Sequence, residues 1–401
     1  MTFETNDAPP PSVAYSRIAA VGDLIEGKFQ VQRILGRGGM GVVVAALHIH
    51  LQEQVALKIL LPSKSTDRES RARFLREARV TARLQNEHIA SVMDVGMLDN
   101  GSPYFVMEFL EGSDLKRLLA VLGQLEIPVA VNYVAQACEG IAEAHARNVL
   151  HRDLKPSNLF LTKRYDGSDL IKVLDFGVSK VRMLGPSDDS YHTEAGTVLG
   201  SPAYMSPERL DDSEVDARAD VWSLGIILYE LLTGRPPFWN TSQAVICAEV
   251  LGWKPATPIR EHRADVPVAL EAAIARALER DVEKRTPNVA ELVADILDAV
   301  PDDPRAADGI SLRRIRAALG QGSLPDIPTV GREEAVTGAD NPTVRPEFLA
   351  QSESRPEPEE VVELPRDVTQ PAPPPYRSVA IGLAIVVGIL AAVVAGIQLT
   401  R

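Results

Sequence analysis

The 401-residue sequence has little cysteine, no excess of positive charge and no apolar run at its start. Its two cysteines, Cys138 and Cys247, form no C-x-x-C or His/Cys cluster, which argues against a disulfide framework and a zinc site. The net charge of −13 would repel a phosphate backbone, so we expect no nucleic-acid partner. Residues 1–20 lack a basic region and a hydrophobic core, so we expect no signal peptide and a cytoplasmic amino-terminal side.

A glycine cluster lies between two short β-type runs, at residues 29–35 and 41–45. The pattern G-x-G-x-x-G also occurs in dinucleotide-binding turns, where a helix follows the glycines. The residues after Gly41 are instead β-branched, which indicates a hairpin. This hairpin resembles the Gly-rich hairpin of protein kinases, which implies that its backbone N–H groups lie over phosphates. The predicted phosphate-covering positions are Gly36, Gly38 and Gly41.

Two further motifs carry the groups that phosphoryl transfer requires. Residues 151–158 are His-Arg-Asp-Leu-Lys-Pro-Ser-Asn, and Asp-Phe-Gly follows at 175–177. Together they supply a carboxylate, oxygen ligands for a metal ion and positive charge. Upstream, the run Val-Ala-Leu-Lys ends at Lys58, nineteen residues before Glu77 on a helix predicted over 68–84. We expect an ion pair between Lys58 and Glu77, with Glu69 and Glu87 as weaker alternatives.

With these motifs in order, the chain resembles a Ser/Thr protein kinase over about residues 29–300. The resemblance implies an α+β, two-lobed fold with a β-rich N-lobe and a helical C-lobe. It also implies that Asp153 orients the acceptor hydroxyl and accepts its proton, and that Lys155 lies beside the γ-phosphate. Lys58, paired with Glu77, would hold the α- and β-phosphates of ATP.

The same resemblance implies the remaining cofactor contacts. Mg²⁺, or Mn²⁺, would be held by Asn158 and Asp175. Side chains lining the adenine pocket would be Val43, Ala56 and Met107, and the backbone at Glu108 and Leu110 would bond the adenine edge. Ser113 or Asp114 is predicted to cap the next helix, and Asp114 could instead bond the ribose.

An activation segment is expected from 175 to 208, ending in Ser-Pro-Glu where the family usually has Ala-Pro-Glu. Glu208 is expected to pair with Arg285 in the C-lobe. Arg152 is of the type that clamps a phosphorylated segment. The candidate phosphosites are Thr193 and Thr197, with Ser190 and Tyr191 behind them. The Gly-Ser pair at 200–201, together with Lys155, favours Ser/Thr over Tyr as the acceptor.

The C-lobe helices are predicted from apolar periodicity and from capping residues. They are expected at 128–147, 220–234, 267–280 and 288–299, with a short further helix at 311–319. Asp220 would brace the backbone of the 151–158 loop. His145 is predicted to be structural, since no second metal ligand lies near it in sequence.

Both ends of the chain are expected to lie outside the kinase domain. Residues 1–28 are predicted to be a disordered arm, and 301–378 a disordered, Pro- and acid-rich linker, because 321–378 alone hold 11 of the 29 prolines. The 21 uncharged residues at 379–399 would form roughly 31 Å of helix, enough to span a bilayer once. The kinase domain would then be cytoplasmic, on a cell-membrane tether.

The tail suggests two kinds of partner. Small residues recur every fourth position in 379–399 and would let two such membrane helices pack closely as a homodimer. Thr329 and Thr343, each within Pro-Thr-Val, are candidate docking points for phospho-Thr-binding partners. The chain thus resembles the bacterial membrane-tethered Ser/Thr kinases, although we expect no external sensor domain after the predicted span.

Two alternatives remain open from the sequence. A catalytically silent pseudokinase scaffold would share the fold, but every expected catalytic position is filled here. A small-molecule phosphotransferase of related fold generally lacks Lys155, the Ser-Pro-Glu element and its Arg285 partner. We therefore expect an ATP-dependent protein serine/threonine kinase that acts on protein substrates, including its own activation segment.

Overall fold

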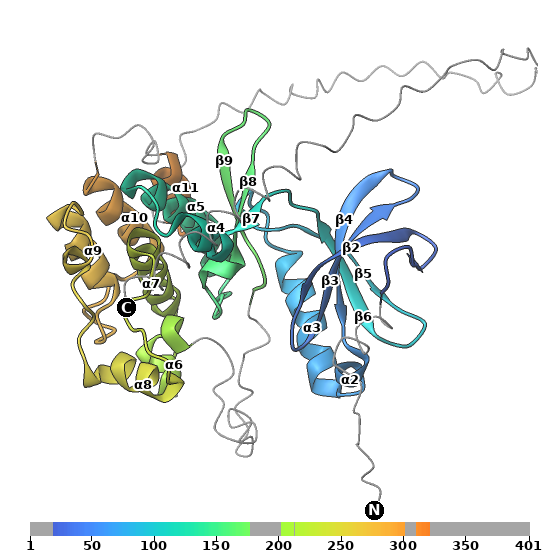
Figure 1. The fold of residues 1–401 in the computed structure, drawn as a ribbon, viewed down its shortest axis with the longest axis horizontal. Helices are drawn as coiled ribbons and strands as arrows, with labels where there is room; N and C mark the ends of the chain where they lie inside the picture. Colours follow the sequence, from blue (N-terminus) through green and yellow to red (C-terminus); the bar gives the residue numbers. More distant parts are fainter. Residues whose placement is uncertain (1–18, 177–201, 212, 301–309, 321–401) are drawn as a thin grey trace, which may run out of the picture. The chain divides into compact units, whose positions relative to one another are not determined.

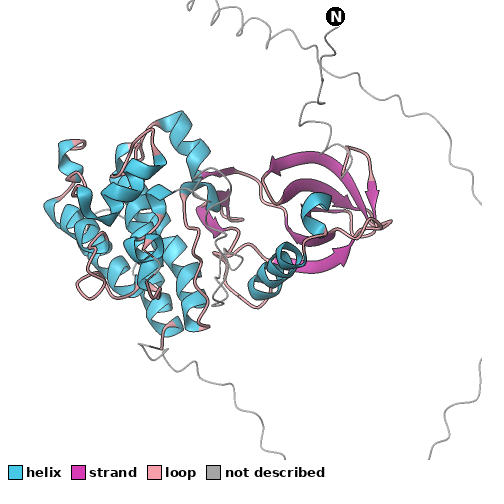
Figure 2. Ribbon diagram, turned by 90° about the horizontal axis from the view of Figure 1, so that it is seen from below, coloured by secondary structure: helices cyan, strands magenta, loops and turns pink. Residues whose placement is uncertain are grey.

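The computed structural model describes residues 19–176, 202–211, 213–300 and 310–320 (Figure 1). All of them belong to one compact unit, Met1–Val330; the second unit, Gly331–Arg401, lies outside the described residues. The described residues form the two lobes that the sequence predicted. Strands dominate one lobe and helices the other, as the colours of Figure 2 show.

The N-lobe is a six-stranded antiparallel sheet in the order β1-β2-β3-β4-β6-β5. Its strands are β1 (Leu24–Ile25), β2 (Phe29–Arg37), β3 (Gly41–His48), β4 (Glu53–Leu60), β5 (Val92–Met97) and β6 (Pro103–Glu108). Two helices, α2 (Pro62–Ser65) and α3 (Arg68–Thr81), follow β4. Asp67 caps α3 by accepting hydrogen bonds from the N–H groups of Glu69 and Ser70. This lobe therefore carries both the glycine hairpin and the helix of Glu77.

The N-lobe begins before Phe29. Residues 19–28, which were expected to be part of a disordered arm, belong to the folded lobe. β1 pairs with the start of β2, and Ala19 and Ile25 are buried in the core of the sheet. The prediction failed because two residues of strand are too short to produce a recognisable period. Residues 1–18 lie outside the described part of the chain.

The C-lobe begins with a small sheet in the order β7-β8-β9. Its strands are β7 (Ser113–Asp114), β8 (Leu159–Lys163) and β9 (Asp169–Val173). The described helices are α4 (Leu115–Leu122), α5 (Ile127–Ala146), α6 (Pro207–Leu210), α7 (Arg218–Thr233), α8 (Gln243–Ala248), α9 (Val268–Ala277), α10 (Val289–Asp298) and α11 (Ile310–Ala318). Helices α5 and α7 are buried along most of their length, so they form the core on which the site residues are mounted.

The predicted C-lobe helices are confirmed, with ends that differ by a few residues. Helix α7 is capped at its carboxyl end by Gly234, whose φ of 78° is left-handed, and a Cβ there would lie 2.4 Å from the Gly123 carbonyl oxygen. Only glycine fits this position. The short helix expected after residue 310 is also present as α11, with Ile315 fully buried in the C-lobe core.

Helices within the described ranges are too short or too polar to cross a membrane. The predicted span at 379–399 lies outside those ranges, as do the linker segments 301–309 and 321–378. The same is true of the candidate phosphosites at 190–197, of Gly177 and of the Gly-Ser pair at 200–201.

Candidate active site

The ammonium group of Lys58 joins the two lobes. From β4, its Nζ lies 2.7 Å from Glu77 Oε1 on α3 and 2.8 Å from Asp175 Oδ1. Burial alone would lower the pKa of Lys58, but the carboxylates of Asp175 and Glu77 outweigh it and raise that pKa above its usual range. Lys58 is therefore a fixed cation. The ion pair with Glu77 that the sequence predicted is present, whereas the contact with Asp175 was not foreseen.

Strand register brings four predicted pocket residues to one face of the N-lobe sheet. Val43 is paired with Lys58, and Ala56 with Met107. Paired residues lie on the same face of a sheet, as do residues two apart on a strand, so all four side chains share the face of Lys58. Met107 also packs partly against the cluster containing Phe105 of β6.

The glycine hairpin lies at the edge of this face. Its turn is closed by a hydrogen bond from Gly38 N–H to the Gly41 carbonyl, at 2.9 Å. A Cβ at Gly36 would meet nothing within 4 Å, and at Gly38 only the Gly41 oxygen at 4.0 Å. A Cβ at Gly41 would instead lie 2.3 Å from the carbonyl oxygen of Ile59. Gly41 is thus required by strand packing, whereas Gly36 and Gly38 leave open space above the sheet.

Glu108 fixes the start of the connection between the lobes. Its N–H donates to the Ser91 carbonyl at 3.0 Å, and its Oε1 accepts from Ser91 N–H at 2.7 Å and from Lys172 Nζ at 2.8 Å. Leu110, the second predicted adenine contact, lies two residues further along this connection. Sequence reasoning assigned Glu108 only a backbone role, because its ion pair joins residues 64 apart.

Asp114 caps α4. Its Oδ1 accepts from the Arg117 N–H at 2.9 Å, and its Oδ2 lies 3.3 Å from Arg117 Nε. Of the two roles that the sequence predicted, capping is confirmed. A bond to the ribose stays a prediction.

The loop at 151–158 gathers a carboxylate, an ammonium and an amide. Lys155 Nζ lies 2.8 Å from Asp153 Oδ2, and Asn158 Nδ2 donates to the Asp153 carbonyl at 2.8 Å. The Leu174 N–H donates to the Asn158 carbonyl, also at 2.8 Å, which ties the loop to the segment that carries Asp175. Residues predicted from two separate motifs are therefore brought together.

Asp220, on α7, anchors the backbone of this loop. Its two oxygens accept the N–H groups of His151 at 2.9 Å and Arg152 at 3.0 Å, and His145 Nε2 lies 2.8 Å away. Burial is the largest single effect and opposes ionisation, but the hydrogen bond with His145 and the electrostatic interactions with His145 and His151 together outweigh it and lower the pKa of Asp220 to about 2. The predicted bracing role is confirmed. Arg152, with a left-handed φ of 64°, has a strained backbone that these bonds hold in place.

The oxygen atoms near Asn158 and Asp175 fit a hard divalent cation. Because Asn158 Nδ2 is held by the Asp153 carbonyl, its Oδ1 is the end left for a ligand. Asp175 bonds Lys58 through Oδ1 and keeps a second carboxylate oxygen. Amide and carboxylate oxygens are the ligands preferred by Mg²⁺ and Mn²⁺.

A second ion pair lies deep in the C-lobe. Arg285 Nη1 and Nη2 bond the two oxygens of Glu208 at 2.7 and 2.9 Å, and both side chains are buried. The guanidinium carbon lies 5.1 Å from the centre of the Trp222 ring. This is the pairing expected from the sequence.

One cluster was not predicted. His88 Nδ1 lies 2.9 Å from the Ile171 carbonyl, and its Nε2 lies 3.7 Å from Glu139 Oε2 and 3.8 Å from Glu87 Oε1. These three residue types can ligate a metal. Arg314 of α11 already faces both carboxylates, with Nη1 at 2.9 Å from Glu87 and 3.4 Å from Glu139. The cluster thus fastens α11 to the rest of the lobe.

Comparison with known proteins identifies the family of the chain. The family described as "Protein kinase domain" matches residues 29–298. The chain is 36% identical over 306 residues to serine/threonine-protein kinase pkn3 of Myxococcus xanthus, covering 76% of this chain and 56% of the relative. It is 35% identical over 288 residues to PknB of Mycolicibacterium smegmatis, covering 70% and 45%. The chain therefore spans about half the length of these curated relatives. Among solved structures, the PknI kinase domain of Mycobacterium tuberculosis matches with a TM-score of 0.55 and 28% identity, covering 70% of this chain and 99% of that one.

Proposed function

The chain belongs to the protein kinase family, and from that premise we propose that it transfers the γ-phosphoryl group of ATP to Ser and Thr hydroxyls of proteins. One observation carries the proposal: the structure brings Lys58, Glu77 and Asp175 together, with the Asp153–Lys155–Asn158 loop tied to the segment of Asp175. Relatives named serine/threonine-protein kinases support the choice of acceptor.

In the proposed reaction, Asp153 orients the acceptor hydroxyl and takes its proton as the oxygen attacks the γ-phosphorus; the bond from that phosphorus to the β–γ bridging oxygen breaks, and ADP leaves. Lys155, 2.8 Å from Asp153, is placed to hold the γ-phosphoryl group near the same carboxylate. Lys58 holds the α- and β-phosphates, and Glu77 fixes its position. Mg²⁺ or Mn²⁺, held by Asn158 and Asp175, supplies charge neutralisation when bound.

The nucleotide lies, in this proposal, against the sheet face shared by Val43, Ala56 and Met107. The open space at Gly36 and Gly38 suits backbone contact with phosphates. The connection after Glu108 would bond the adenine edge through its backbone, including that of Leu110. Both expectations follow from strand register and from the family to which the chain belongs.

We further propose how the activity is placed in the cell. A kinase domain over 29–300 would be tethered by the 301–378 linker to a single membrane helix at 379–399, on the cytoplasmic side. Two copies could then pair through that helix and phosphorylate each other at Thr193 or Thr197. Thr329 and Thr343 would recruit phospho-Thr-binding partners. The support is the composition of these segments.

The acceptor is the feature to test first. The full chain, purified in mild detergent, is incubated with ATP, Mg²⁺ and an equimolar set of peptides that differ only in carrying Ser, Thr or Tyr. We expect phosphate on the Ser and Thr peptides and on the chain itself, located by mass spectrometry. Transfer confined to Tyr, or to small-molecule alcohols added in parallel, would contradict the proposal.

A further inference from the structure

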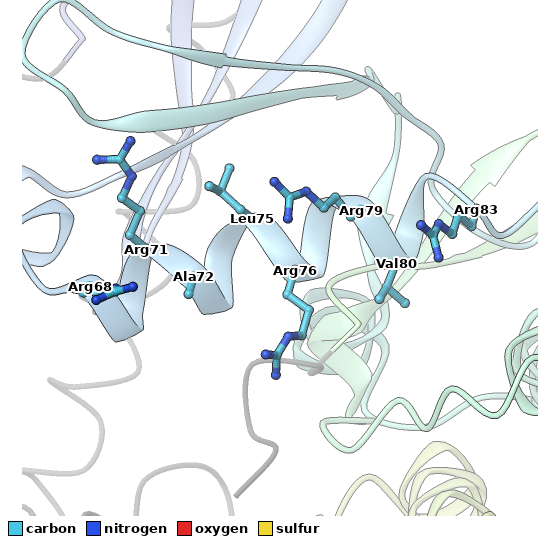
Figure 3. Close-up of a pocket in the computed structure, with 8 residues that line it drawn as sticks. All are labelled: Arg68, Arg71, Ala72, Leu75, Arg76, Arg79, Val80 and Arg83. Carbon is cyan, nitrogen blue, oxygen red and sulfur yellow. The ribbon is translucent and has the colours of Figure 1, made fainter. Parts of the chain in front are cut away.

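The outward face of α3 carries an arginine groove, defined here as the hollow of about 510 Å³ along this helix (Figure 3). It is lined by five arginines and three apolar residues: Arg68, Arg71, Arg76, Arg79, Arg83, Ala72, Leu75 and Val80. In Figure 3, Arg71 and Arg79 extend from one side of the helix and Arg76 from the other. The opposite face of α3 is buried against the N-lobe and holds Glu77.

No carboxylate lines this groove, although the whole chain has a net charge of −13. The neighbouring Glu69 lies 3.6 Å from Arg73, which is outside the groove. Within the described ranges, the guanidinium groups of Arg68, Arg76 and Arg79 make no ion pair. The positive charge of the groove is therefore concentrated and unneutralised by the part of the chain that the structure describes.

This arrangement weakens the helix. Arg68 and Arg71 are three apart, and so are Arg76 and Arg79, whereas Arg83 lies in the turn just after the helix ends at Thr81. Like charges at these spacings are neighbours on a helix surface and repel each other. An anion shared by each pair would remove that repulsion.

The chemistry of the groove favours phosphate. Its cations are all arginines, whose planar guanidinium forms bidentate bonds with phosphate oxygens. A phosphate monoester carries nearly two negative charges and so balances a pair of arginines, whereas one carboxylate balances only one. Leu75 and Val80, both half-buried, offer an apolar floor between the charged groups.

We propose that the arginine groove binds a Ser/Thr-phosphorylated segment of a partner protein. The proposal rests on the proposed function, since such a segment is the product of that reaction. The midpoints of the Arg68–Arg71 and Arg79–Arg83 pairs lie about eleven residues apart along the chain, which is about 17 Å at ~1.5 Å per helical residue. An extended peptide rises ~3.3 Å per residue, so two phosphates about five residues apart would reach both pairs.

The test measures binding of a fluorescent peptide with two phosphothreonines five positions apart and a leucine between them. The full chain is treated with phosphatase and assayed by fluorescence anisotropy without ATP. We expect binding that weakens with added salt, and more than tenfold weaker binding by the Arg68→Gln/Arg79→Gln/Arg83→Gln variant. Gln preserves helix propensity. The matched control is Arg73→Gln, which removes an arginine of the same helix outside the groove and should leave binding unchanged.

Several results would overturn the proposal: equal binding of the unphosphorylated peptide, equal binding by the triple variant, or an equal loss with Arg73→Gln. Binding to phosphatidylserine vesicles with none to the peptide would assign the groove to lipid instead. Because the assay needs no turnover, the two proposals fail separately. A chain that binds the peptide but transfers no phosphate contradicts the proposed function, whereas one that transfers phosphate without binding contradicts the groove.

Discussion

Two regions of the molecule each pair a basic side chain with carboxylates, but they differ in whether a carboxylate remains accessible to a ligand. In the C-lobe, Arg285 and Glu208 satisfy each other through two hydrogen bonds, with both side chains buried. Between the lobes, Lys58 is shared by Glu77 and Asp175, and the side chain of Asp175 is 46% exposed. A closed pair can only hold the fold, whereas a shared cation beside an accessible carboxylate can also hold a ligand.

Breaking the closed pair should have the largest effect on stability. We expect Arg285→Ala to lower the free energy of unfolding by about 3–5 kcal/mol, because it leaves the buried Glu208 carboxylate without its partner. Urea denaturation measures this loss. Lys284→Ala, at an exposed neighbour, should lower the free energy of unfolding far less, because solvent screens its ion pair with Asp281. A loss below about 1 kcal/mol for Arg285→Ala would contradict the structural role of the pair.

Breaking the open network should instead affect turnover. Lys58→Met removes the cation shared by Glu77 and Asp175, and we expect kcat for phosphoryl transfer to fall at least about 100-fold. The fold should survive, which thermal unfolding can check. Lys64→Met makes the same change at an exposed lysine of α2 and should leave kcat unchanged. A comparable fall of kcat in both variants would refute the role of Lys58.

Asp220 combines features of both regions: its carboxylate is buried and fully hydrogen-bonded, as in the Arg285–Glu208 pair, and yet it positions the 151–158 loop of the active site. Its pKa of about 2 in the folded chain is below the ordinary 3.8, so its stabilising contribution is complete above about pH 4 and disappears as the pH falls through 2. This amounts to about 2 kcal/mol. We expect the stability difference between the wild type and Asp220→Asn to shrink by that amount between pH 4.5 and 2. A pH-independent difference would show that Asp220 acts only through its shape.

The smallest effect is expected at the surface. Arg314 contacts Glu87 and Glu139, but its side chain is 55% exposed, so solvent screens the pairs. Arg314→Gln should lower the free energy of unfolding by less than about 1 kcal/mol and mainly speed amide hydrogen exchange in α11. A decrease of more than about 3 kcal/mol in the free energy of unfolding would show that this exposed contact stabilises the fold as much as the buried Arg285–Glu208 pair.

The sequence predicted most of the fold because its motifs are local. Helix periodicity located α5 and α7, and residues far apart in sequence could be paired where both belong to known motifs, as for Lys58 with Glu77 and Glu208 with Arg285. The roles assigned to these residues remain predictions, since geometry alone does not test them.

What the sequence could not predict depends on tertiary packing. The contact between His145 and Asp220 joins residues 75 apart, and that between Lys172 and Glu108 joins residues 64 apart. In neither case does a spacing rule link the partners. The same holds for Arg314 and its cluster, and for the early start of the sheet at β1.

The most direct test of the central claim is single-turnover transfer from γ-labelled ATP by the full chain, beside Asp153→Asn. ATP affinity and the free energy of unfolding are measured for both. We predict label on Ser or Thr of the wild type, a transfer rate lower by about 100-fold or more in Asp153→Asn, and similar ATP affinity and stability in the two chains. Equal rates in the two chains, or ATP bound by the wild type without any transfer, would contradict the account.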